Sequence, residues 1–252
     1  MSFDLTGRTA LITGASRGIG AAITLALARA GADVAINSRG QEALDALAGQ
    51  VRALGRRALV LPADVTDPDA ARGMVTAAID GLGSLDVLVS NVGGTSYRGP
   101  FAGLRFSGWE KVMRLNVDST VHVVQAAAPH LLERGSASVI IVSSVAAFGA
   151  VPGLAPYGAS KAALISLTKS LAVEWATTGV RVNALCPGWT ATDLNRGLWQ
   201  DEKIYAELTA AIPMGRWATP EEMAGPALFL ASSASSFMTG QALIVDGGQN
   251  AV

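Results

Sequence analysis

The chain has 252 residues, half of them apolar, and a formal net charge of −1 at pH 7. This apolar content can form a substantial core, whereas the balanced charge, without any basic run, gives no electrostatic footprint for nucleic acid or for an acidic membrane surface. No apolar run reaches the roughly 18 residues of a membrane span, and the N-terminus lacks the basic-then-apolar pattern of a signal peptide, so we expect a cytoplasmic protein without membrane partners.

The first predicted element is a short apolar strand at 9–13, which runs directly into a glycine-rich turn and an apolar helix at 21–30. The turn reads Gly14-Ala15-Ser16-Arg17-Gly18-Ile19-Gly20. Glycine lets the backbone turn tightly and approach a pyrophosphate, and the N-terminus of the following helix offers unpaired N–H groups to an anion. The spacing departs from the G-x-G-x-x-G dinucleotide fingerprint, so the mechanism supports phosphate binding while an ordinary strand-to-helix turn stays open.

The second predicted strand, at 33–38, indicates which dinucleotide the chain would bind. An acidic residue at the end of this strand would bind ribose hydroxyls and repel a 2′-phosphate. This chain has Ser38 followed by Arg39, and Arg17 in the glycine turn would lie near the same ribose. Two guanidinium groups suit charge-assisted hydrogen bonds to a phosphate, which favours NADP(H) over NAD(H). The alternative is that both arginines are solvated surface residues.

Further apolar strands are predicted at 58–62, 87–90, 138–143, 180–186 and 242–245, with helical patterns between most of them. This alternation predicts an α/β fold in one doubly wound domain over 1–252, with a seven-stranded parallel sheet and helices on both faces. One irregular insertion lies at about 190–218. Its apolar side chains suggest either a hydrophobic substrate pocket or ordinary core packing, and they are Leu194, Leu198, Trp199, Ile204, Tyr205 and Leu208.

A tyrosine and a lysine four residues apart, Tyr157 and Lys161, stand at the predicted start of a helix after Pro156. Residues at i and i+4 share a helix face, so the lysine ammonium would lie beside the phenol. A free phenol has a pKa of about 10, and nearby positive charge lowers this pKa by stabilising the phenolate. Together with Ser144, the pair predicts a proton-transfer site, although for this motif alone an accidental pair on a surface helix is the simpler alternative.

These motifs, in this order, resemble the short-chain dehydrogenase/reductase family in its form of about 250 residues, including members similar to 3-oxoacyl-[acyl-carrier-protein] reductases. The likeness covers almost the whole chain. Further matches are Pro187-Gly188 after a strand, Ile212-Pro213-Met214-Gly215-Arg216 with Pro220-Glu221-Glu222, and Val245-Asp246-Gly247-Gly248. One departure is Ser90-Asn91-Val92-Gly93, where the family usually has Asn-Asn-Ala-Gly. This departure puts side-chain contacts from Ser90 in doubt, but not backbone contacts.

The resemblance implies a Rossmann-type fold and a catalytic tetrad of Asn116, Ser144, Tyr157 and Lys161. In it, Tyr157 exchanges a proton with the substrate oxygen, Ser144 binds that oxygen, and Lys161 lowers the pKa of the tyrosine. Lys161 would also hold the nicotinamide ribose, and Asn116 would bind a water in a proton relay, with a helix-kinking or capping role as the alternative. The implied cofactor-binding residues are Gly14, Ser16, Arg17, Gly18, Ile19, Gly20, Ser38, Arg39, Asp64, Val65, Ser90, Asn91, Gly93, Tyr157, Lys161, Pro187, Gly188, Thr190 and Thr192.

Some of these residues have specific implied contacts. Asp64 resembles the family residue that contacts the adenine amino group, although an aspartate at this point also suits turn capping. Thr190 and Thr192 resemble positions that contact the nicotinamide carboxamide, but threonine in a loop is also common without such a role. The insertion at about 190–218 resembles the family's mobile substrate lid.

Other side chains indicate no further chemistry. His122 and His130 are eight residues apart on a predicted helix, which is not the i, i+4 spacing of a metal-binding pair, so we expect no metal. Cys186 is the only cysteine, and we expect it to pack as a small hydrophobe after a buried strand. Family members commonly pair the helices at about 109–133 and 157–175 between subunits, which implies a homotetramer, whereas burial within one chain would give similar patterns.

The expected activity is NADP(H)-dependent hydride transfer between a ketone and a secondary alcohol, with a small-molecule substrate. The candidate substrates are a 3-oxoacyl thioester and a smaller apolar or aryl ketone, between which the sequence does not choose. The alternative from a different class is a catalytically silent NADP(H)-binding regulator on the same fold. An intact tetrad argues against that alternative, because a regulator is free to lose catalytic residues.

Overall fold

The computed structural model describes residues 2–251, and its central feature is a parallel sheet of seven strands. The strands are β1 (Thr9–Ile12), β2 (Asp33–Ser38), β3 (Ala58–Pro62), β4 (Val87–Ser90), β5 (Ala137–Val142), β6 (Val180–Pro187) and β7 (Ala242–Val245). They lie in the order β3-β2-β1-β4-β5-β6-β7, and every neighbouring pair is parallel. The predicted strands are therefore confirmed, with ends that differ by a single residue at most.

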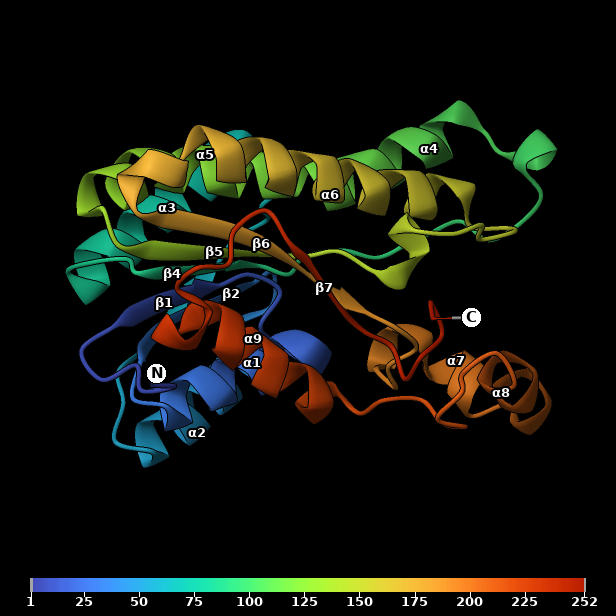
Figure 1. The fold of residues 1–252 in the computed structure, drawn as a ribbon, viewed down its shortest axis with the longest axis horizontal. Coiled ribbons are helices and arrows are strands. Elements are labelled where there is room, and N and C mark those ends of the chain that lie inside the picture. The colour runs from blue at the N-terminus through green and yellow to red at the C-terminus, as the bar shows by residue number, and fades with distance from the viewer. Residues whose placement is uncertain (1, 252) are drawn as a thin grey trace.

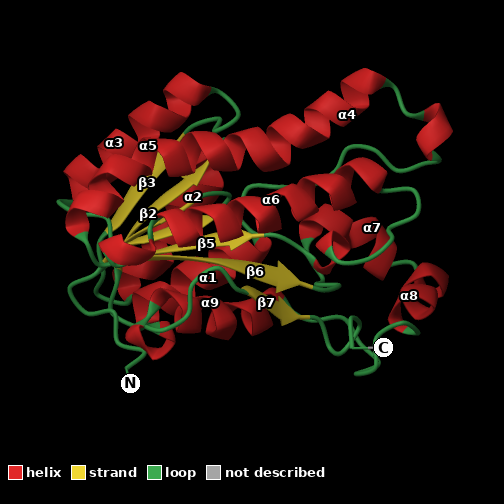
Figure 2. Cartoon of the chain, turned by 45° about the horizontal axis from the view of Figure 1, so that its top comes forward, coloured by secondary structure: helices red, strands yellow, loops and turns green. Residues whose placement is uncertain are grey.

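Helices cover both faces of the sheet, as Figures 1 and 2 show. One face carries α1 (Gly18–Arg29), α2 (Gln41–Ala53) and α9 (Ala224–Ala231). The opposite face carries α3 (Pro68–Leu82), α4 (Phe106–Met113), α5 (Ser119–Arg134) and α6 (Ala155–Glu174). Two further helices, α7 (Arg196–Trp199) and α8 (Glu202–Thr209), extend past the carboxyl ends of β6 and β7. This is the doubly wound, Rossmann-type arrangement that the sequence predicted.

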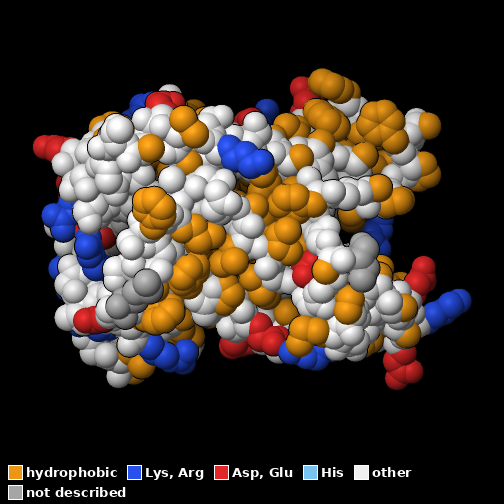
Figure 3. Space-filling model, viewed as in Figure 1, with side chains coloured by type: hydrophobic (Ala, Val, Ile, Leu, Met, Phe, Trp, Pro, Cys, Tyr) orange, Lys and Arg blue, Asp and Glu red, His pale blue; other side chains and the backbone are white. Residues whose placement is uncertain are grey.

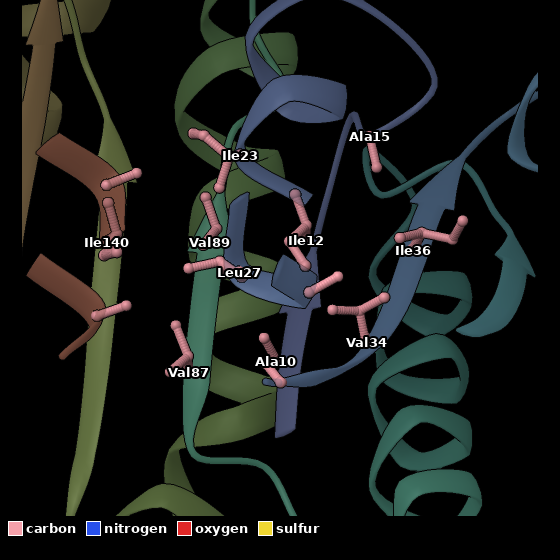
Figure 4. Close-up of a cluster of buried hydrophobic side chains, with 14 of the residues drawn as sticks. Ala10, Ile12, Ala15, Ile23, Leu27, Val34, Ile36, Val87, Val89 and Ile140 are labelled. Atoms are coloured by element: carbon pink, nitrogen blue, oxygen red, sulfur yellow. The ribbon is translucent and has the colours of Figure 1, made fainter. Parts of the chain in front are cut away.

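Alternate side chains of the strands form two halves of the core, one on each face of the sheet. On one face, Ile12 of β1 packs in a cluster with Ile23 and Leu27 of α1, as Figure 4 shows. On the other face, Leu11 of β1 belongs to a cluster that includes Val123 of α5. Because both faces of the sheet are buried, most of its strands read in the sequence as apolar runs rather than alternating patterns, and β6, with Arg181 and Asn183, is the exception.

Local signals in the sequence fix where elements begin and end, and α3 is the clearest case. The carboxylate of Asp67 accepts the backbone N–H groups of Asp69 and Ala70, both at 2.9 Å, so it caps the helix N-terminus. Pro68 opens the helix, where its missing N–H costs no hydrogen bond. Gly83 ends it with a left-handed φ of 83°.

The strand order determines where a ligand can bind. The chain moves from β1 to β2 and β3 in one direction, and then returns to place β4 on the other side of β1. The connections after β1 and β4 therefore leave the carboxyl edge of the sheet on opposite sides. They open a crevice between them, which is where ligands bind in open α/β sheets.

One part of the surface is rich in exposed apolar side chains. Apolar side chains gather over α4 and the loop before it, at the upper right of Figure 3. They include Phe101 and Phe106, which are 66% and 73% exposed. Within residues 2–251, no helix combines the length and the apolar character that crossing a bilayer requires.

Candidate active site

The predicted proton-transfer pair lies at the start of α6. Pro156 stands in the first turn of this helix and Tyr157 follows it. Lys161 comes one turn later, and its Nζ lies 5.7 Å from the centroid of the Tyr157 ring. Lys161 is only 3% exposed, and its Nζ donates a hydrogen bond to the Val142 carbonyl at 2.9 Å. The two groups are therefore held side by side, as the i, i+4 spacing predicted.

Ser144 enters the same site from the end of β5. Its backbone is extended, and its Oγ accepts the N–H of Ala146 at 3.2 Å, which caps a short 3-10 turn. The same side chain lies close enough to the Tyr157 hydroxyl to lower the pKa of the phenol. The loop after β5 and the first turn of α6 thus bring a serine hydroxyl, a phenol and an ammonium group together.

Burial dominates the titration of this pair. It raises the pKa of Tyr157 above the ordinary value of 10.0, because a buried phenolate is poorly solvated, and the hydrogen bond with Ser144 opposes this shift. Burial also lowers the pKa of Lys161 to about 8, with an opposing contribution from Cys186. The direction for Tyr157 is opposite to the lowered pKa expected from the sequence, because the cost of burying the phenolate is the largest cause of the shift.

Cys186, near the end of β6, is fully buried and free. Burial raises the pKa of its thiol to about 12, so the thiol is protonated at neutral pH and is a poor nucleophile. The side chain packs in a small apolar cluster with Ile165 and Ala184. This is the packing role expected from the sequence.

Asn116 lies in a π-helical turn, Arg114–Asp118, that joins α4 to α5. Its Oδ1 accepts the N–H of Gly94 at 2.7 Å, and its Nδ2 donates to the Gly94 carbonyl at 2.9 Å and to the Ser160 hydroxyl at 2.8 Å. Asn116 is fully buried, and these bonds use both of its amide protons. The side chain therefore joins α6 to the loop after β4, and it has no donor left for a relay water.

The glycine turn after β1 forms a cradle that side chains would fill. Gly14 and Gly18 have left-handed φ values of 63° and 55°, which other residues rarely adopt. A Cβ on Gly20 would lie only 2.3 Å from the Gly14 carbonyl oxygen. Helix α1 begins here without a side-chain cap and without an acidic residue in its first turn, so its N–H groups and positive dipole end are available. These features fit a dinucleotide pyrophosphate.

The loop after β4 closes the cradle from the other side. Asn91 donates from Nδ2 to the main-chain carbonyls of residues 13 and 14, at 3.2 and 3.1 Å, which ties this loop to the glycine turn. A Cβ on Gly93 would lie 2.8 Å from Lys161 Nζ and 2.9 Å from Asn116 Oδ1. A larger residue at position 93 would therefore displace Lys161 or Asn116, because the main chain passes against these catalytic candidates.

The carboxyl ends of β2 and β3 carry the residues predicted to bind the adenosine end. Arg17 and Arg39 are exposed, and the Ser38 hydroxyl donates to a main-chain carbonyl two residues later at 3.0 Å. Hydrogen bonds from the backbone and hydroxyl of Thr66 lower the pKa of Asp64, and Arg39 adds a smaller effect. Asp64 thus performs the turn capping that was the alternative for it, while its contact with adenine stays a prediction. No acid stands at the end of β2 to repel a 2′-phosphate.

Two predicted cofactor contacts use side chains that are already bonded within the protein. Ser90 is buried, and its hydroxyl donates to Thr120 at 3.0 Å. Thr190 is 4% exposed, and its hydroxyl donates to the Gly188 carbonyl at 3.1 Å. At both positions, a contact made by the main chain agrees better with this geometry than one made by the side chain.

Other predicted cofactor residues lie along the carboxyl edge. Pro187 ends β6, and a Cβ on the following Gly188 would lie 2.7 Å from the Cα of Asp246, so this position also needs glycine. Ser16 and Ile19 are half-buried in the glycine turn and at the start of α1. The structure thus brings both glycine-containing segments to the crevice that the sheet order creates.

The insertion at 190–218 reaches both halves of the site. The Thr192 methyl group lies 3.3 Å from the position that a Cβ on Gly18 would take, which places the start of the insertion against the glycine turn. Leu194 is 64% exposed, and one of its methyl groups lies 3.4 Å from the corresponding position on Gly94. Leu194 therefore borders the loop after β4 at Gly94, the residue that Asn116 binds.

The base of this insertion is held by aromatic packing. The rings of Trp189 and Trp217 are stacked with centroids 4.7 Å apart, and Tyr205 lies against Trp217 at 5.5 Å. A parallel bridge between Thr190 and Ala218 joins the two ends of the insertion. Tyr205 therefore serves packing, whereas a hydrophobic substrate pocket lined by this insertion stays a prediction.

The two histidines contact backbone groups of different elements. His122 Nδ1 lies 3.2 Å from the carbonyl oxygen of Val65, one of the predicted cofactor residues, which is itself buried. His130 Nε2 accepts the N–H of Leu85 at 3.0 Å. Across residues 2–251, no three side chains of the metal-binding types gather at one place.

Sequence reasoning missed three groups that position the tetrad. Gly94 and Ser160 both bind Asn116, and the Val142 carbonyl accepts from Lys161. Neither Gly94 nor Ser160 has a sequence signal of its own beyond its place beside a motif. Val142 acts through a carbonyl, which every residue has, so no residue type could reveal it.

Comparisons with known proteins agree with this site. Residues 14–250 match the protein family described as Enoyl-(Acyl carrier protein) reductase. The gluconate 5-dehydrogenase of Gluconobacter oxydans (strain 621H) is 42% identical over 246 residues, which cover 98% of this chain and 96% of that protein. The crystal structure of a gluconate 5-dehydrogenase from Burkholderia cenocepacia J2315, in complex with NADP and tartrate, is 40% identical with a TM-score of 0.94, covering 99% of this chain and 98% of that chain. The crystal structure of a short-chain type dehydrogenase/reductase from Mycobacterium marinum is 38% identical with a TM-score of 0.94, covering 99% of this chain and 98% of that chain.

A dinucleotide cradle on a Rossmann-type sheet, beside a serine, a tyrosine and a lysine suited to proton transfer, defines an oxidoreductase that acts on CH–OH groups. The chain belongs to the short-chain dehydrogenase/reductase family. A catalytically silent regulator, the alternative weighed from the sequence, gains no support from these relatives.

Proposed function

We propose that this chain is an NADP(H)-dependent dehydrogenase that interconverts a secondary alcohol and a ketone in a sugar acid or a related hydroxy acid. The observation that carries the substrate class is the similarity to two gluconate 5-dehydrogenases, one of them in complex with NADP and tartrate. Gluconate and tartrate are both polyhydroxylated carboxylates. The 3-oxoacyl thioester and the small apolar or aryl ketone, which the sequence left open, gain no such support.

The chain's own residues would manage the substrate oxygen while the nicotinamide exchanges the hydride. The Tyr157 hydroxyl would exchange a proton with that oxygen, and Ser144, which lies beside the phenol, would orient it. The positive charge of Lys161, close to the Tyr157 ring, would favour the phenolate when the alcohol is oxidised. The glycine turn at 14–20 and the main chain at Gly93 would hold the dinucleotide against these groups.

A carboxylate substrate calls for a cation near the site, and Arg98 is our candidate for it. It lies in the loop after β4, where the neighbouring Gly99 donates its N–H to the Gly153 carbonyl at 2.9 Å, in the loop that leads into α6. Arg98 is exposed, and none of the ion pairs within residues 2–251 involves it. An arginine can bind a carboxylate through two parallel hydrogen bonds, so we assign Arg98 to the substrate carboxylate.

Oxidation of D-gluconate compared with D-glucitol tests this assignment, because the two differ only in a carboxylate against a CH₂OH group. We expect kcat/KM with NADP⁺ to be higher for gluconate, and Arg98→Gln to lower it by about tenfold or more, the scale of a lost charge-assisted hydrogen bond. Arg105→Gln, which changes another exposed arginine of the same connection, is the control. Equal rates on both compounds, or a gluconate rate that Arg98→Gln leaves intact, would contradict the assignment.

The preference for NADP(H) rests on Arg17 and Arg39, beside a β2 that ends without an acid. Replacing Arg39 with aspartate removes one guanidinium and adds an anion where the 2′-phosphate would lie. We therefore expect the ratio of kcat/KM for NAD⁺ over NADP⁺ to rise by about a hundredfold, from a lost charge-assisted bond plus a new repulsion. Arg29→Asp, at the far end of α1, makes the same charge change as a control. An unchanged ratio would place the phosphate elsewhere.

We also propose that residues 190–218 act as the substrate lid of a single domain, and that the chain assembles as a homotetramer through the outer faces of α5 and α6. The exposed face of α6 carries a stripe of mostly small side chains that would permit close helix packing, and they are Ala159, Ala162, Ser166, Ser170 and Val173. If sedimentation velocity at micromolar concentration detected monomer alone, the proposed tetramer would be rejected.

A further inference from the structure

Ser160 connects two of the four tetrad residues through buried hydrogen bonds. Its hydroxyl oxygen accepts from Asn116 Nδ2 at 2.8 Å, and its own proton goes to the main-chain carbonyl of Tyr157 at 2.7 Å. Ser160 and Asn116 are both fully buried. The result is a continuous path from the π-helical turn before α5 to the first turn of α6, without any intervening water.

The directions of these bonds leave no alternative partner. Asn116 has two amide protons, which go to Gly94 and Ser160, and its Oδ1 accepts from the N–H of Gly94. Because Asn116 Nδ2 can only donate, the Ser160 hydroxyl oxygen must accept its hydrogen bond. The single hydroxyl proton of Ser160 is then free to bond the Tyr157 carbonyl. A buried network in which every donor is used holds its members in one arrangement, since breaking any bond strands a polar group.

The end of α6 that carries Tyr157 needs such support. Helix α6 begins without a side-chain cap that would tie its first turn to the preceding loop, so the position of this turn depends on other contacts. The path through Ser160 ties this turn to Asn116 and, through it, to the loop that passes against Lys161 at Gly93. The main chain that carries the phenol is therefore tied to a residue outside the tetrad.

We propose that Ser160 is a positioning residue for the reaction, which fixes the first turn of α6 against Asn116 and thereby holds the Tyr157 hydroxyl in its productive place. It does not touch the substrate oxygen. This inference deepens the proposed function and rests on it only for the existence of a measurable turnover, because any substrate that the wild type oxidises can serve.

Ser160→Ala removes the hydroxyl with little change in volume, and Thr168→Val is its matched control. Thr168 is equally buried in α6, and its hydroxyl donates to the Leu164 carbonyl at 2.8 Å in the same manner, without a link to the tetrad. We expect Ser160→Ala to lower kcat with D-gluconate and NADP⁺ by about tenfold to a hundredfold, the range expected when a catalytic group is misplaced. KM for both compounds should stay within about twofold, and Thr168→Val should keep wild-type kcat.

The rate is expressed per cofactor-binding site, counted by titration with NADPH fluorescence, so that unfolded protein does not enter it. Wild-type kcat per site in Ser160→Ala would overturn the proposal and leave Ser160 a packing residue, as would an equal fall in Thr168→Val. If Ser160→Ala yields no folded protein, Ser160→Cys decides, because the thiol is a weaker hydrogen-bonding group at the same place. A kcat of Ser160→Cys clearly below the wild-type value supports the proposal, and a wild-type kcat in that variant overturns it. A wild type that oxidises no hydroxy acid contradicts the proposed function instead.

Discussion

Replacing Tyr157 with phenylalanine is expected to lower kcat by at least about a hundredfold, the usual scale of a lost general acid or base. The ring would keep its packing at the start of α6, while the hydroxyl beside Ser144 would disappear. Cofactor binding should persist, because the glycine cradle after β1 does not depend on that hydroxyl. Steady-state kinetics and NADPH titration measure the two properties separately.

Tyr205→Phe is the matched control for this change. Tyr205 is one of only three tyrosines in the chain, and it lies against Trp217 at the base of the 190–218 insertion. Removing its hydroxyl should leave kcat near the wild-type value. A Tyr157→Phe protein with near-normal turnover would refute the assignment of the phenol, and loss of NADPH binding in it would point to a structural defect.

Much of the fold follows from the sequence because a parallel sheet covered on both faces leaves an unambiguous pattern. The strand at 87–90 has three consecutive apolar residues that all become buried, since helices cover both sides of the sheet. The glycine turn could also be predicted from the sequence, because the positive φ of Gly14 and Gly18 favours glycine at these positions. Such signals are local, so neighbouring residues are enough to reveal them.

The candidate site was less predictable where its properties depend on burial and on distant partners. The sequence placed Lys161 beside Tyr157 correctly, yet the direction of the tyrosine pKa was wrong, because the degree of burial comes from the whole fold. Asn116 could be matched to a motif, but not its bonds to Gly94 and Ser160, which lie far away along the chain. Side-chain direction across elements is set by packing, and no spacing rule encodes it.

Replacing Lys161 with methionine is expected to raise the free energy of unfolding at pH 7 while lowering kcat by about a hundredfold or more, since the charge beside the phenol is lost. Burial lowers the pKa of Lys161 from 10.5 to about 8, so at pH 7 the fold holds an ammonium group that water would solvate better. A shift of this size corresponds to about 3 kcal/mol. Loss of the hydrogen bond to Val142 offsets part of it, which leaves a gain of about 1 to 3 kcal/mol.

The difference in the free energy of unfolding between Lys161→Met and the wild type should depend on pH, and this dependence gives the sharper test of Lys161. Between pH 8 and 10.5, the unfolded chain binds a proton that the folded chain has released, so wild-type stability rises with pH through this window relative to Lys161→Met. Urea unfolding at several pH values should therefore show the advantage of the variant fully present below pH 8 and shrinking above it. Lys169→Met, on the exposed side of α6, should show no such trend. A Lys161→Met protein that is less stable than the wild type at pH 7 would mean that the buried ammonium contributes to folding as well as to catalysis.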